Sequence, residues 1–430
     1  MILLVTLYML LLPLQSGVVP PEVHPKRMVT RLETDSLTVV LIDKKQGYSV
    51  EETETLDADV LSPKSINIHP DGSKYYVNSL EGMRTVAYDF ATGRKLAVIH
   101  HSFDSTQLAL WADDSGLFPC DYPYKEPKTF SGKPVESTFS HQGRYLWVPY
   151  YRRSYDLNAQ DPSAVAVIDT QCDTIVRMFE TGPLPKMIAT SPDGTRLAIT
   201  HWGNNTVGLL DISGDDIAAW HYIDCYTVDY KLKLNYSRTK SVNRDVGSGY
   251  CLRGTAFTPD GRYLLVGCMG GGGGIAVIDL EKEQYLGRVM GMMPNLRHLV
   301  FKNGFLYLSI NNKGYVQRVP EERVYAAIDT LASAKGKVVS IPEWESCKIP
   351  AGARTIVLSP DGRYVFAACN FSSKIAVVDT RTMKLLGTLD ADSYPVGLDI
   401  SDDGCYLFST SQARDSKGGN AVDIFKVTYK

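Results

Sequence analysis

One short cassette returns seven times along this chain of 430 residues: an apolar run, a turn of the Pro-Asp-Gly type, and a second apolar run. β-Branched and aromatic residues dominate the runs, which favours strands, and the turn supplies a Gly that tolerates positive φ. The turns are HPDG at 69–72, SHQG at 140–143, SPDG at 191–194, TPDG at 258–261, FKNG at 301–304, SPDG at 359–362 and SDDG at 401–404. Such regular repetition predicts a repeat architecture.

Six of the seven copies continue into a strand resembling VxVID, and the FKNG copy continues into GYVQRV at 314. With a fourth strand after it, the unit is an antiparallel meander of roughly 40 residues, the size of a propeller blade. The seven copies predict an all-β fold, a single seven-bladed β-propeller of four-stranded blades over residues 36–430. The last copy lacks a fourth strand. We expect N-terminal residues 47–56 to supply it and close the ring. A further strand at 37–43 leaves eight blades as an alternative.

The N-terminus suggests export. Residues 1–16 are apolar from Ile2 to Leu14 and then turn small and polar, which has the length of a signal-peptide core and is too short to span a bilayer. A basic segment before this core is missing, and a buried N-terminal segment is the other interpretation. We therefore expect a signal peptide at 1–16, a lead-in at 17–35, and a periplasmic, surface-bound or secreted protein without a transmembrane anchor.

An even number of cysteines, eight, permits disulfides in an exported chain. Cys225 and Cys251 bracket one insertion and are the candidate pair. Cys268 and Cys369 occupy the same position in their copies, which predicts free, buried thiols.

Composition excludes several classes of function. A net charge of −3 gives no general attraction to nucleic acid, and no basic run or finger spacing appears. No CxxC motif supports a haem or a zinc ribbon, so no cofactor is indicated.

The segments at 253–289 and 354–389, RGTAFTPDGRYLLVGCMGGGGGIAVIDLEKEQYLGRV and RTIVLSPDGRYVFAACNFSSKIAVVDTRTMKLLGTL, resemble the YVTN-type β-propeller repeats of exported and surface-layer-like bacterial proteins. The resemblance covers nearly all of the chain after residue 36. It implies a propeller and leaves the ligand open, because the fold hosts unrelated activities.

Basic residues recur where the first strand of a blade begins. The residues eight positions before the turn Gly are Lys64, Val135, Lys186, Arg253, Leu296, Arg354 and Val396, with Glu136 and Arg297 one position later. Since the first strands of a propeller line its channel, we expect Lys64, Lys186, Arg253, Arg297 and Arg354 to converge at one mouth and attract an anion. The alternative is that they bond neighbouring loop carbonyls or hold water.

A second set lies seven or eight residues after the turn Gly, at the same predicted face. Tyr150, His201, Trp202 and Asn370 provide aromatic and hydrogen-bonding groups suited to a pocket wall. A single His in such a strand is more often structural, and no second His shares its register, so we expect no metal site.

Five insertions, at 100–134, 151–163, 215–252, 320–352 and 411–420, are expected to decorate that face, and the 321–334 segment within one of them has a helical pattern. The combined features favour an exported binding module for a protein, a glycan or a small anionic ligand, with no catalytic residue assigned. The alternative is a propeller enzyme of quinoprotein or lactonase type, with the basic residues as anion clamps and His201 or Glu136 as general base. A purely structural surface-layer role is the third possibility.

Overall fold

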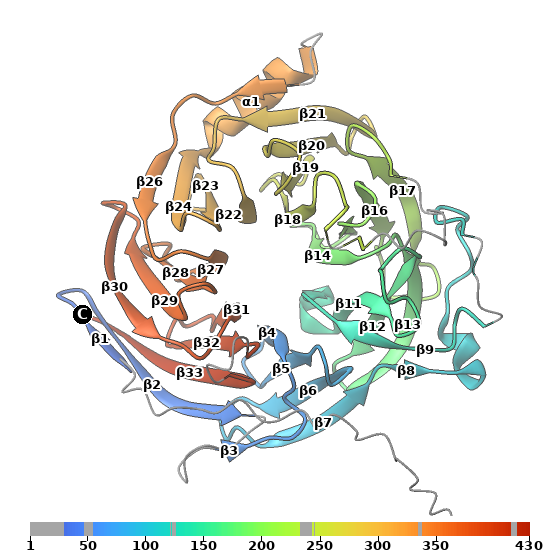
Figure 1. Ribbon diagram of the computed structural model, residues 1–430, viewed down its shortest axis with the longest axis horizontal. Helices are drawn as coiled ribbons and strands as arrows, with labels where there is room; N and C mark the ends of the chain where they lie inside the picture. The colour runs from blue at the N-terminus through green and yellow to red at the C-terminus, as the bar shows by residue number, and fades with distance from the viewer. Residues whose placement is uncertain are drawn as a thin grey trace, which may run out of the picture.

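The computed structural model describes residues 30–430 except 47–54, 121, 123–125, 233–242, 245, 334–337 and 414–418. The described strands form seven sheets arranged as a ring around a common centre (Figure 1). Neighbouring strands of each four-stranded blade are antiparallel, so the predicted seven-bladed β-propeller is confirmed. The predicted signal peptide and most of the lead-in lie outside the described residues.

The first three blades follow the order of the chain from the centre outward. Blade 1 consists of β4 (Pro63–Ile68), β5 (Lys74–Ser79), β6 (Arg84–Asp89) and β7 (Lys95–His100). Blade 2 consists of β10 (Thr138–Ser140), β11 (Tyr145–Arg153), β12 (Ser163–Asp169) and β13 (Thr174–Thr181), extended by β8 (Ser102–Phe103) and β9 (Phe130–Pro134). Blade 3 consists of β14 (Pro185–Thr190), β15 (Arg196–His201), β16 (Thr206–Asp211) and β17 (His221–Thr227).

The other four blades complete the ring. Blade 4 consists of β18 (Leu252–Phe257), β19 (Tyr263–Cys268), β20 (Ile275–Asp279) and β21 (Gln284–Met290), with β25 (Val338–Ser340) at its edge. Blade 5 consists of β22 (Leu296–Lys302), β23 (Phe305–Ile310), β24 (Tyr315–Pro320) and β26 (Glu345–Lys348). Blade 6 consists of β27 (Ala353–Leu358), β28 (Tyr364–Cys369), β29 (Lys374–Asp379) and β30 (Lys384–Asp390). Blade 7 consists of β31 (Pro395–Ile400), β32 (Tyr406–Ser411), β33 (Ala421–Tyr429) and the N-terminal β2 (Leu37–Gln46).

The Gly turns join the first two strands of each blade. In blade 6, Gly362 adopts a φ of 70° and its N–H donates to the Ser359 carbonyl at 2.8 Å. The Asp361 carboxylate accepts from the Ser359 hydroxyl and from the Arg363 N–H, at 2.5 and 3.0 Å. These hydrogen bonds join only residues within the turn, so the turn depends on its local sequence. The Ser-Pro-Asp-Gly pattern can therefore be recognised from the sequence alone.

The ring is closed by the two ends of the described chain. β2 runs antiparallel to β33, from the pair Leu37–Tyr429 to the pair Gln46–Ala421. The prediction that residues 47–56 supply the closing strand was therefore wrong, because β2 supplies it. Most of 47–56 lies outside the described residues, and its last two residues form β3 (Thr55–Leu56), which pairs with β2 in parallel. The segment at 37–43 belongs to this closing strand, so it does not begin an eighth blade. A short β1 (Arg31–Glu33) pairs with the outside of β2.

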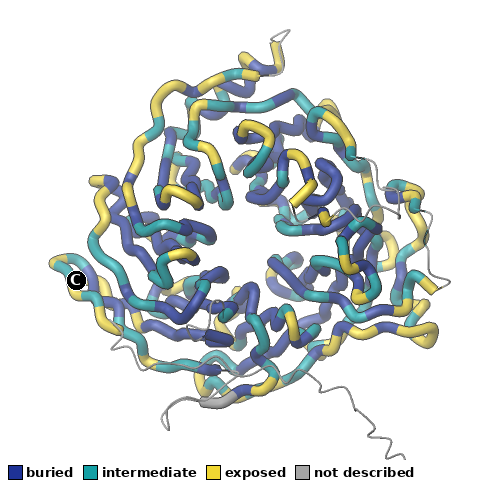
Figure 2. Tube along the Cα trace, in the orientation of Figure 1, coloured by how far each residue is buried: buried dark blue, intermediate teal, exposed yellow. Residues whose placement is uncertain are grey.

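Clusters of buried apolar side chains join neighbouring blades all around the ring. Most of the buried residues lie on the inner strands of the blades, and exposed residues are more frequent toward the rim (Figure 2). One such cluster joins Leu37 and Val39 of β2 to Phe425 of β33 and to Phe366 of blade 6. Closure thus adds apolar packing to the backbone ladder, and both contributions stabilise the ring.

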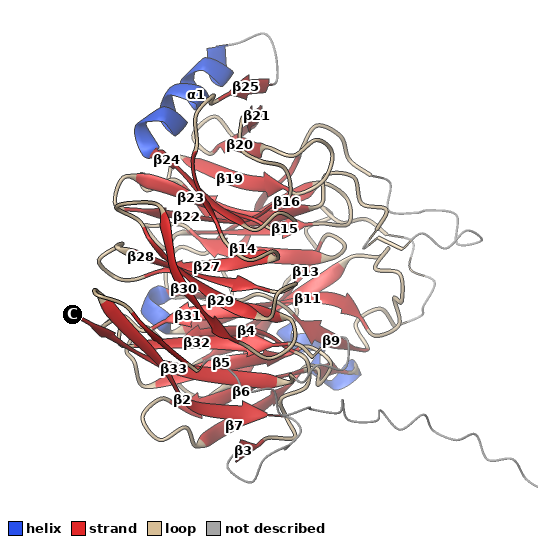
Figure 3. Ribbon diagram, turned by 60° about the vertical axis from the view of Figure 1, so that its left-hand side comes forward, coloured by secondary structure: helices blue, strands red, loops and turns tan. Residues whose placement is uncertain are grey.

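The insertion at 320–352 was placed on the wrong face by the sequence. It joins β24 to β26, the third and fourth strands of blade 5, and therefore leaves the blade at the edge that carries the Gly turns. Its helix α1 (Glu321–Ser333) confirms the predicted helix and packs outside the ring beside β21 and β25 (Figures 1 and 3). The first part of the 215–252 insertion also precedes a fourth strand, β17, where Trp220 stacks on His141 of the SHQG turn.

We predict that weakening the closing strand destabilises the protein far more than an equal truncation on its exposed side. Leu37→Ala removes a side chain with 0% exposure and should lower the free energy of unfolding by about 3 kcal/mol. Ile42→Ala, at 51% exposure in the same strand, should cost less than about 0.5 kcal/mol. Chemical denaturation measures both values, and equal effects would contradict the role of β2 in closure.

Candidate functional site

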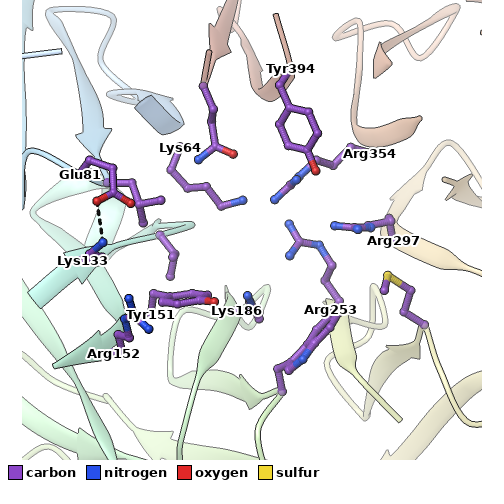
Figure 4. A pocket seen from close by; sticks show the side chains of 15 residues that line it. Lys64, Glu81, Lys133, Tyr151, Arg152, Lys186, Arg253, Arg297, Arg354 and Tyr394 are labelled. Carbon is purple, nitrogen blue, oxygen red and sulfur yellow. Dashed lines mark hydrogen bonds and ion pairs between the residues drawn. The ribbon is translucent and has the colours of Figure 1, made fainter. Parts of the chain in front are cut away.

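The five predicted cations line one cavity of about 500 Å³. The described residues that line it come from all seven blades, which places it at the centre of the ring (Figure 4). Its lining comprises Lys64, Leu80, Glu81, Lys133, Val135, Tyr151, Arg152, Lys186, Trp202, Arg253, Met269, Arg297, Arg354, Tyr394 and Gln412. Seven of these side chains are basic and one is acidic.

A shared backbone irregularity aims these cations. In blade 1, Pro63 pairs with Ser79 and Ser65 pairs with Asn78, so Lys64 is left out of the ladder. The register shifts at the same place in blades 3, 4, 5, 6 and 7. A bulge of this kind redirects a side chain. Here it turns the second residue of the inner strand into the cavity.

The residue before the inner strand has a recurrent conformation as well. Six blades place a positive-φ residue there: Ser62 (50°), Leu184 (57°), Cys251 (51°), Asn295 (73°), Gly352 (95°) and Tyr394 (65°). Five of the six are not glycine, and such conformations carry a strain that the surrounding structure must hold. Because this positive-φ residue recurs in six blades, it is a regular part of the loop that leads into the inner strand.

This structural register explains Arg297. Counting eight residues back from the turn Gly puts Leu296 in line with the other cations, because this blade has one residue fewer between its cation and its turn Gly. In the structure, Arg297 is the residue skipped between the pairs Leu296–Ile310 and His298–Ser309. It is therefore the equivalent of Lys64, Lys186, Arg253 and Arg354.

Hydrogen bonds between blades hold the backbone of several of these positions. The Ser309 hydroxyl of blade 5 donates to the Arg354 carbonyl of blade 6 at 2.6 Å, and the Thr355 hydroxyl of blade 6 donates to the Val396 carbonyl of blade 7 at 2.6 Å. Ser65 donates in the same way to the Val135 carbonyl at 2.8 Å. The cavity is thus built on a rigid inner ring.

One carboxylate, Glu136, lies next to the cavity and serves two of the cations. It accepts a hydrogen bond from Arg253 at 2.9 Å and lies 3.4 Å from the Lys64 ammonium, and all three side chains are buried. The contact ties blades 1, 2 and 4 together. Burial raises the pKa of Glu136, while the charge of Arg253 opposes that increase.

Arg297 has a different environment. Among the described residues it makes no hydrogen bond or ion pair, and its Nε is buried without a partner. Burial and the neighbouring charge of Arg253 lower the pKa of Arg297 to about 9. The guanidinium therefore stays charged at neutral pH. A half-buried cation with its Nε out of contact with water favours an anion from solution.

Three aromatic side chains complete the walls. The Lys186 ammonium lies 4.1 Å from the Tyr151 ring centroid and 5.1 Å from that of Trp202. The Tyr394 ring lies 5.9 Å from the Arg354 guanidinium carbon. Cations over ring faces are held by the ring quadrupole and lose water in the process.

Two of the residues predicted to form the pocket wall are buried elsewhere. The His201 Nδ1 is 2.8 Å from the Thr206 hydroxyl, its ring packs on Phe118, and burial lowers its pKa to about 3. The Tyr150 hydroxyl is 2.9 Å from the Nδ1 of His101, and its side chain is 0% exposed. Side chains alternate in direction along a strand. Tyr150 and His201 therefore point away from the cavity, whereas the residues that follow them, Tyr151 and Trp202, line it.

Of the other predicted wall residues, Trp202 lines the cavity and Asn370 does not. Asn370 is buried and accepts from the Asn311 amide at 3.2 Å. The structure contains no disulfide between Cys225 and Cys251, so the predicted pair is not formed. Cys268 and Cys369 are free and buried, as expected.

The sequence reasoning missed Tyr394, Lys133, Arg152 and Gln412 as lining residues. The signal for Gln412 was available, since it stands eight residues after its turn Gly, in the same register as Tyr151 and Trp202. Lys133 pairs with Glu81 at 2.6 Å. It lies in the insertion at 100–134, where positions cannot be assigned by counting from a turn Gly.

Within the described ranges, no group of three or more His, Cys, Asp or Glu side chains could hold a metal ion. None of the helices in the part of the chain that the structure describes combines the length and hydropathy that a membrane span needs.

No protein-family model matches the chain. It is similar to Antigen Lp49 of Leptospira interrogans, with 27% identity over 209 residues that cover 44% of this chain and 41% of that protein. It is also similar to the beta subunit of hydrazine synthase of Kuenenia stuttgartiensis, with 25% identity over 256 residues that cover 51% of this chain and 59% of that protein. The chain therefore spans about half the length of these two relatives.

Two solved structures share the architecture. Hydrazine synthase of Kuenenia stuttgartiensis aligns with a TM-score of 0.58 and 13% identity, covering 89% of this chain and 99% of that one. The β-propeller domain of Myceliophteria thermophila Cps50 (Swd1) aligns with a TM-score of 0.58 and 12% identity, covering 90% and 100%. These likenesses show the propeller fold, and the finer YVTN resemblance stays a prediction.

We predict that Glu136→Gln destabilises the protein by about 3 kcal/mol, because it leaves the buried Lys64 and Arg253 without their shared carboxylate. Added inorganic phosphate should recover part of this loss by replacing the charge. The control is Glu81→Gln, whose carboxylate is 53% exposed and should cost less than about 1 kcal/mol. Chemical denaturation at low ionic strength measures both, and equal losses in the two variants would contradict the assignment.

Proposed function

We propose that this propeller is a binding module that holds a small anionic ligand in its central cavity. The observation that carries the proposal is the convergence of Arg253, Arg297 and Arg354, which enter from three successive blades and point toward one another (Figure 4). Guanidinium groups bind carboxylates and phosphates through paired, directional hydrogen bonds. Three of them at one point suit a ligand with at least one such group.

The size of the cavity supports a small ligand. Its volume of about 500 Å³ is in the range of small-molecule sites. The cavity combines a basic centre with the aromatic walls of Tyr151, Trp202 and Tyr394, and it sits on the rigid inner strands. A protein or a glycan bound on the surrounding loops remains compatible with the fold, but the concentration of charge favours a ligand that enters the ring.

The alternative of a propeller enzyme shares the anion site and differs in needing a general base. Of the two candidates, His201 is buried away from the cavity and Glu136 is engaged by Arg253 and Lys64. Binding without these bases is therefore the better supported function. The relatives' names describe an antigen and a subunit of an enzyme, and neither name specifies a ligand for this chain.

We predict that small anions bind to the intact chain and that Arg297→Gln weakens them. A charged hydrogen bond contributes about 1.5–3 kcal/mol, so the affinity should fall by about tenfold or more. Isothermal titration calorimetry with inorganic phosphate, malonate and citrate measures it. The matched control is Arg262→Gln, whose side chain pairs with Glu281 outside the cavity and should leave binding unchanged. Binding that survives Arg297→Gln, or silence across all three anions, would overturn the proposal.

We also propose that the protein is exported, on the strength of the apolar run from Ile2 to Leu14. Expression of residues 1–430 in a bacterium should yield a product outside the cytoplasm whose intact mass lacks about the first 16 residues. Leu10→Arg, which places a charge in the run, should keep the chain inside and uncleaved. An exported protein that retains the segment, or a variant that is exported equally well, would contradict a cleaved signal peptide.

A further inference from the structure

The Gly turn of blade 2, at 140–143, is built differently from most of the others. Five of the seven turns place an Asp directly before the Gly, and its carboxylate accepts a hydrogen bond from the N–H two residues later. These residues are Asp71, Asp193, Asp260, Asp361 and Asp403. In blade 2 the corresponding residue is Gln142, whose amide bonds to no residue that the structure describes. The amide is therefore not used to close the turn.

The backbone of this turn is strained. His141, Gln142 and Gly143 adopt φ values of 51°, 54° and 94°, which makes three successive left-handed residues, two of them not glycine. No other Gly turn has three. Residues with side chains adopt this region only where the surrounding structure holds them, and such positions cluster at functional sites. The turn therefore depends on support from neighbouring segments.

A chain of hydrogen bonds supplies this support. The Trp147 Nε1 donates to the Ser140 hydroxyl at 2.9 Å, and that hydroxyl lies 2.9 Å from the His141 Nδ1. The His141 Nε2 donates to the Gly214 carbonyl at 3.0 Å, and its ring stacks on Trp220 with 4.9 Å between the centroids. Gly214 and Trp220 belong to the loop that joins β16 to β17. This loop of blade 3 is thus fixed to the strained turn of blade 2.

The turn and the loop border a pocket of about 470 Å³, a volume in the range of small-molecule sites. Its lining residues are His141, Gln142, Arg144, Tyr145 and Asp215. The Gly turns lie at the other end of the inner strands from the bulges. The pocket is therefore on the face opposite the mouth of the central cavity and is separate from the anion site.

Several polar groups of the pocket are not engaged by the protein. Asp215 is exposed, and its carboxylate makes no hydrogen bond or ion pair within the described part of the chain. The same holds for the hydroxyl of Tyr145. Arg144 pairs with Asp169 through one nitrogen, and its guanidinium carbon lies 5.5 Å from the Tyr145 ring centroid. Its other nitrogens remain available to a ligand, since the side chain is 34% exposed.

The charges around the pocket disfavour ionic ligands. A cation would meet the Asp215 carboxylate, but the Arg144 guanidinium over the Tyr145 ring would repel it. An anion would be repelled by Asp215, and Asp169 already offsets the charge of Arg144. A neutral ligand with several hydroxyl groups meets neither repulsion, because a hydroxyl both donates and accepts hydrogen bonds.

We propose that this pocket binds a neutral saccharide unit, with its hydroxyl groups shared among the Asp215 carboxylate, the Gln142 amide and the Arg144 guanidinium. A pyranose ring carries hydroxyls on consecutive carbons, so it presents several donors and acceptors to one wall at once. The four polar side chains of that wall supply both kinds of partner. The proposal concerns a second site and does not depend on anion binding in the central cavity.

The test titrates the intact protein with the methyl glycosides of glucose, galactose, mannose and N-acetylglucosamine, followed by saturation-transfer difference NMR. We expect at least one of them to bind with a millimolar or lower dissociation constant. Because the ligand is neutral, raising the ionic strength from about 0.02 M to about 0.5 M should change this constant by less than about twofold. If none of the four glycosides binds, the proposal is overturned.

Two variants locate the bound glycoside. Asp215→Ala should weaken binding by about tenfold, since a hydrogen bond to a charged group is lost. Gln142→Gly should weaken binding by about threefold or more without making the protein easier to denature, because glycine adopts a left-handed φ freely. The control is Asp402→Ala, which removes an exposed carboxylate from the Gly turn of blade 7 and should leave binding unchanged. Circular dichroism confirms that each variant is folded.

The remaining outcomes separate this site from the central cavity. Glycoside binding that persists in Arg297→Gln and falls in Asp215→Ala supports the proposal. Binding that Asp215→Ala leaves intact, or that Arg297→Gln abolishes, overturns it. Displacement of the glycoside by glycine or by tetramethylammonium would show that the pocket prefers charged ligands, and this result also overturns it. Calorimetry with phosphate, malonate and citrate decides the anion site independently of all these results.

Discussion

The pairing of β2 with β33 is the interaction on which the rest of the structure depends. In six blades the four strands come from one stretch of the chain, but the seventh is complete only when residues near the two ends of the described chain meet. This pairing removes the open edges of the ring, and Leu37 and Val39 add their packing to blades 6 and 7. Because the central cavity draws on all seven blades, its geometry exists only in the closed ring.

Closure of the ring does not by itself create a binding site. The repeated bulge at the start of the inner strands is also needed, because it turns the cations into the cavity. A strand that kept its register would place the second residue in the ladder, with its side chain fixed by the pleat. Skipping that residue frees Lys64, Lys186, Arg253, Arg297 and Arg354 to face one space. The resulting repulsion is offset in part by Glu136, whose single carboxylate serves two cations. The excess of positive charge is what gives the cavity its preference for anions.

Much of the fold and part of the site were predictable from sequence. The turns and the strand pattern are local, so the cassettes predicted the blades, and the helical pattern at 321–334 predicted helix α1. The sequence also identified Arg297 as a cation of this set although Leu296 stands at the counted position, and the structure shows that one residue fewer before the turn Gly of that blade shifts the count by one. Tyr150 and His201 were chosen one position too early, because a strand residue and its neighbour face opposite directions. The insertion at 320–352 was misplaced, since its length conceals which two strands it joins.

By itself, then, the sequence predicted the architecture, with seven blades preferred to eight, and the set of cations that recur at one register, because each follows from patterns within about 40 residues. The tertiary structure alone decided which N-terminal segment closes the ring, that Tyr394 faces the cavity while Tyr150 does not, and that Glu136 of blade 2 reaches Arg253 of blade 4. These contacts join residues far apart in the chain. Their existence depends on how the ring closes and on the angle at which each bulge turns its side chain, and no local pattern encodes either.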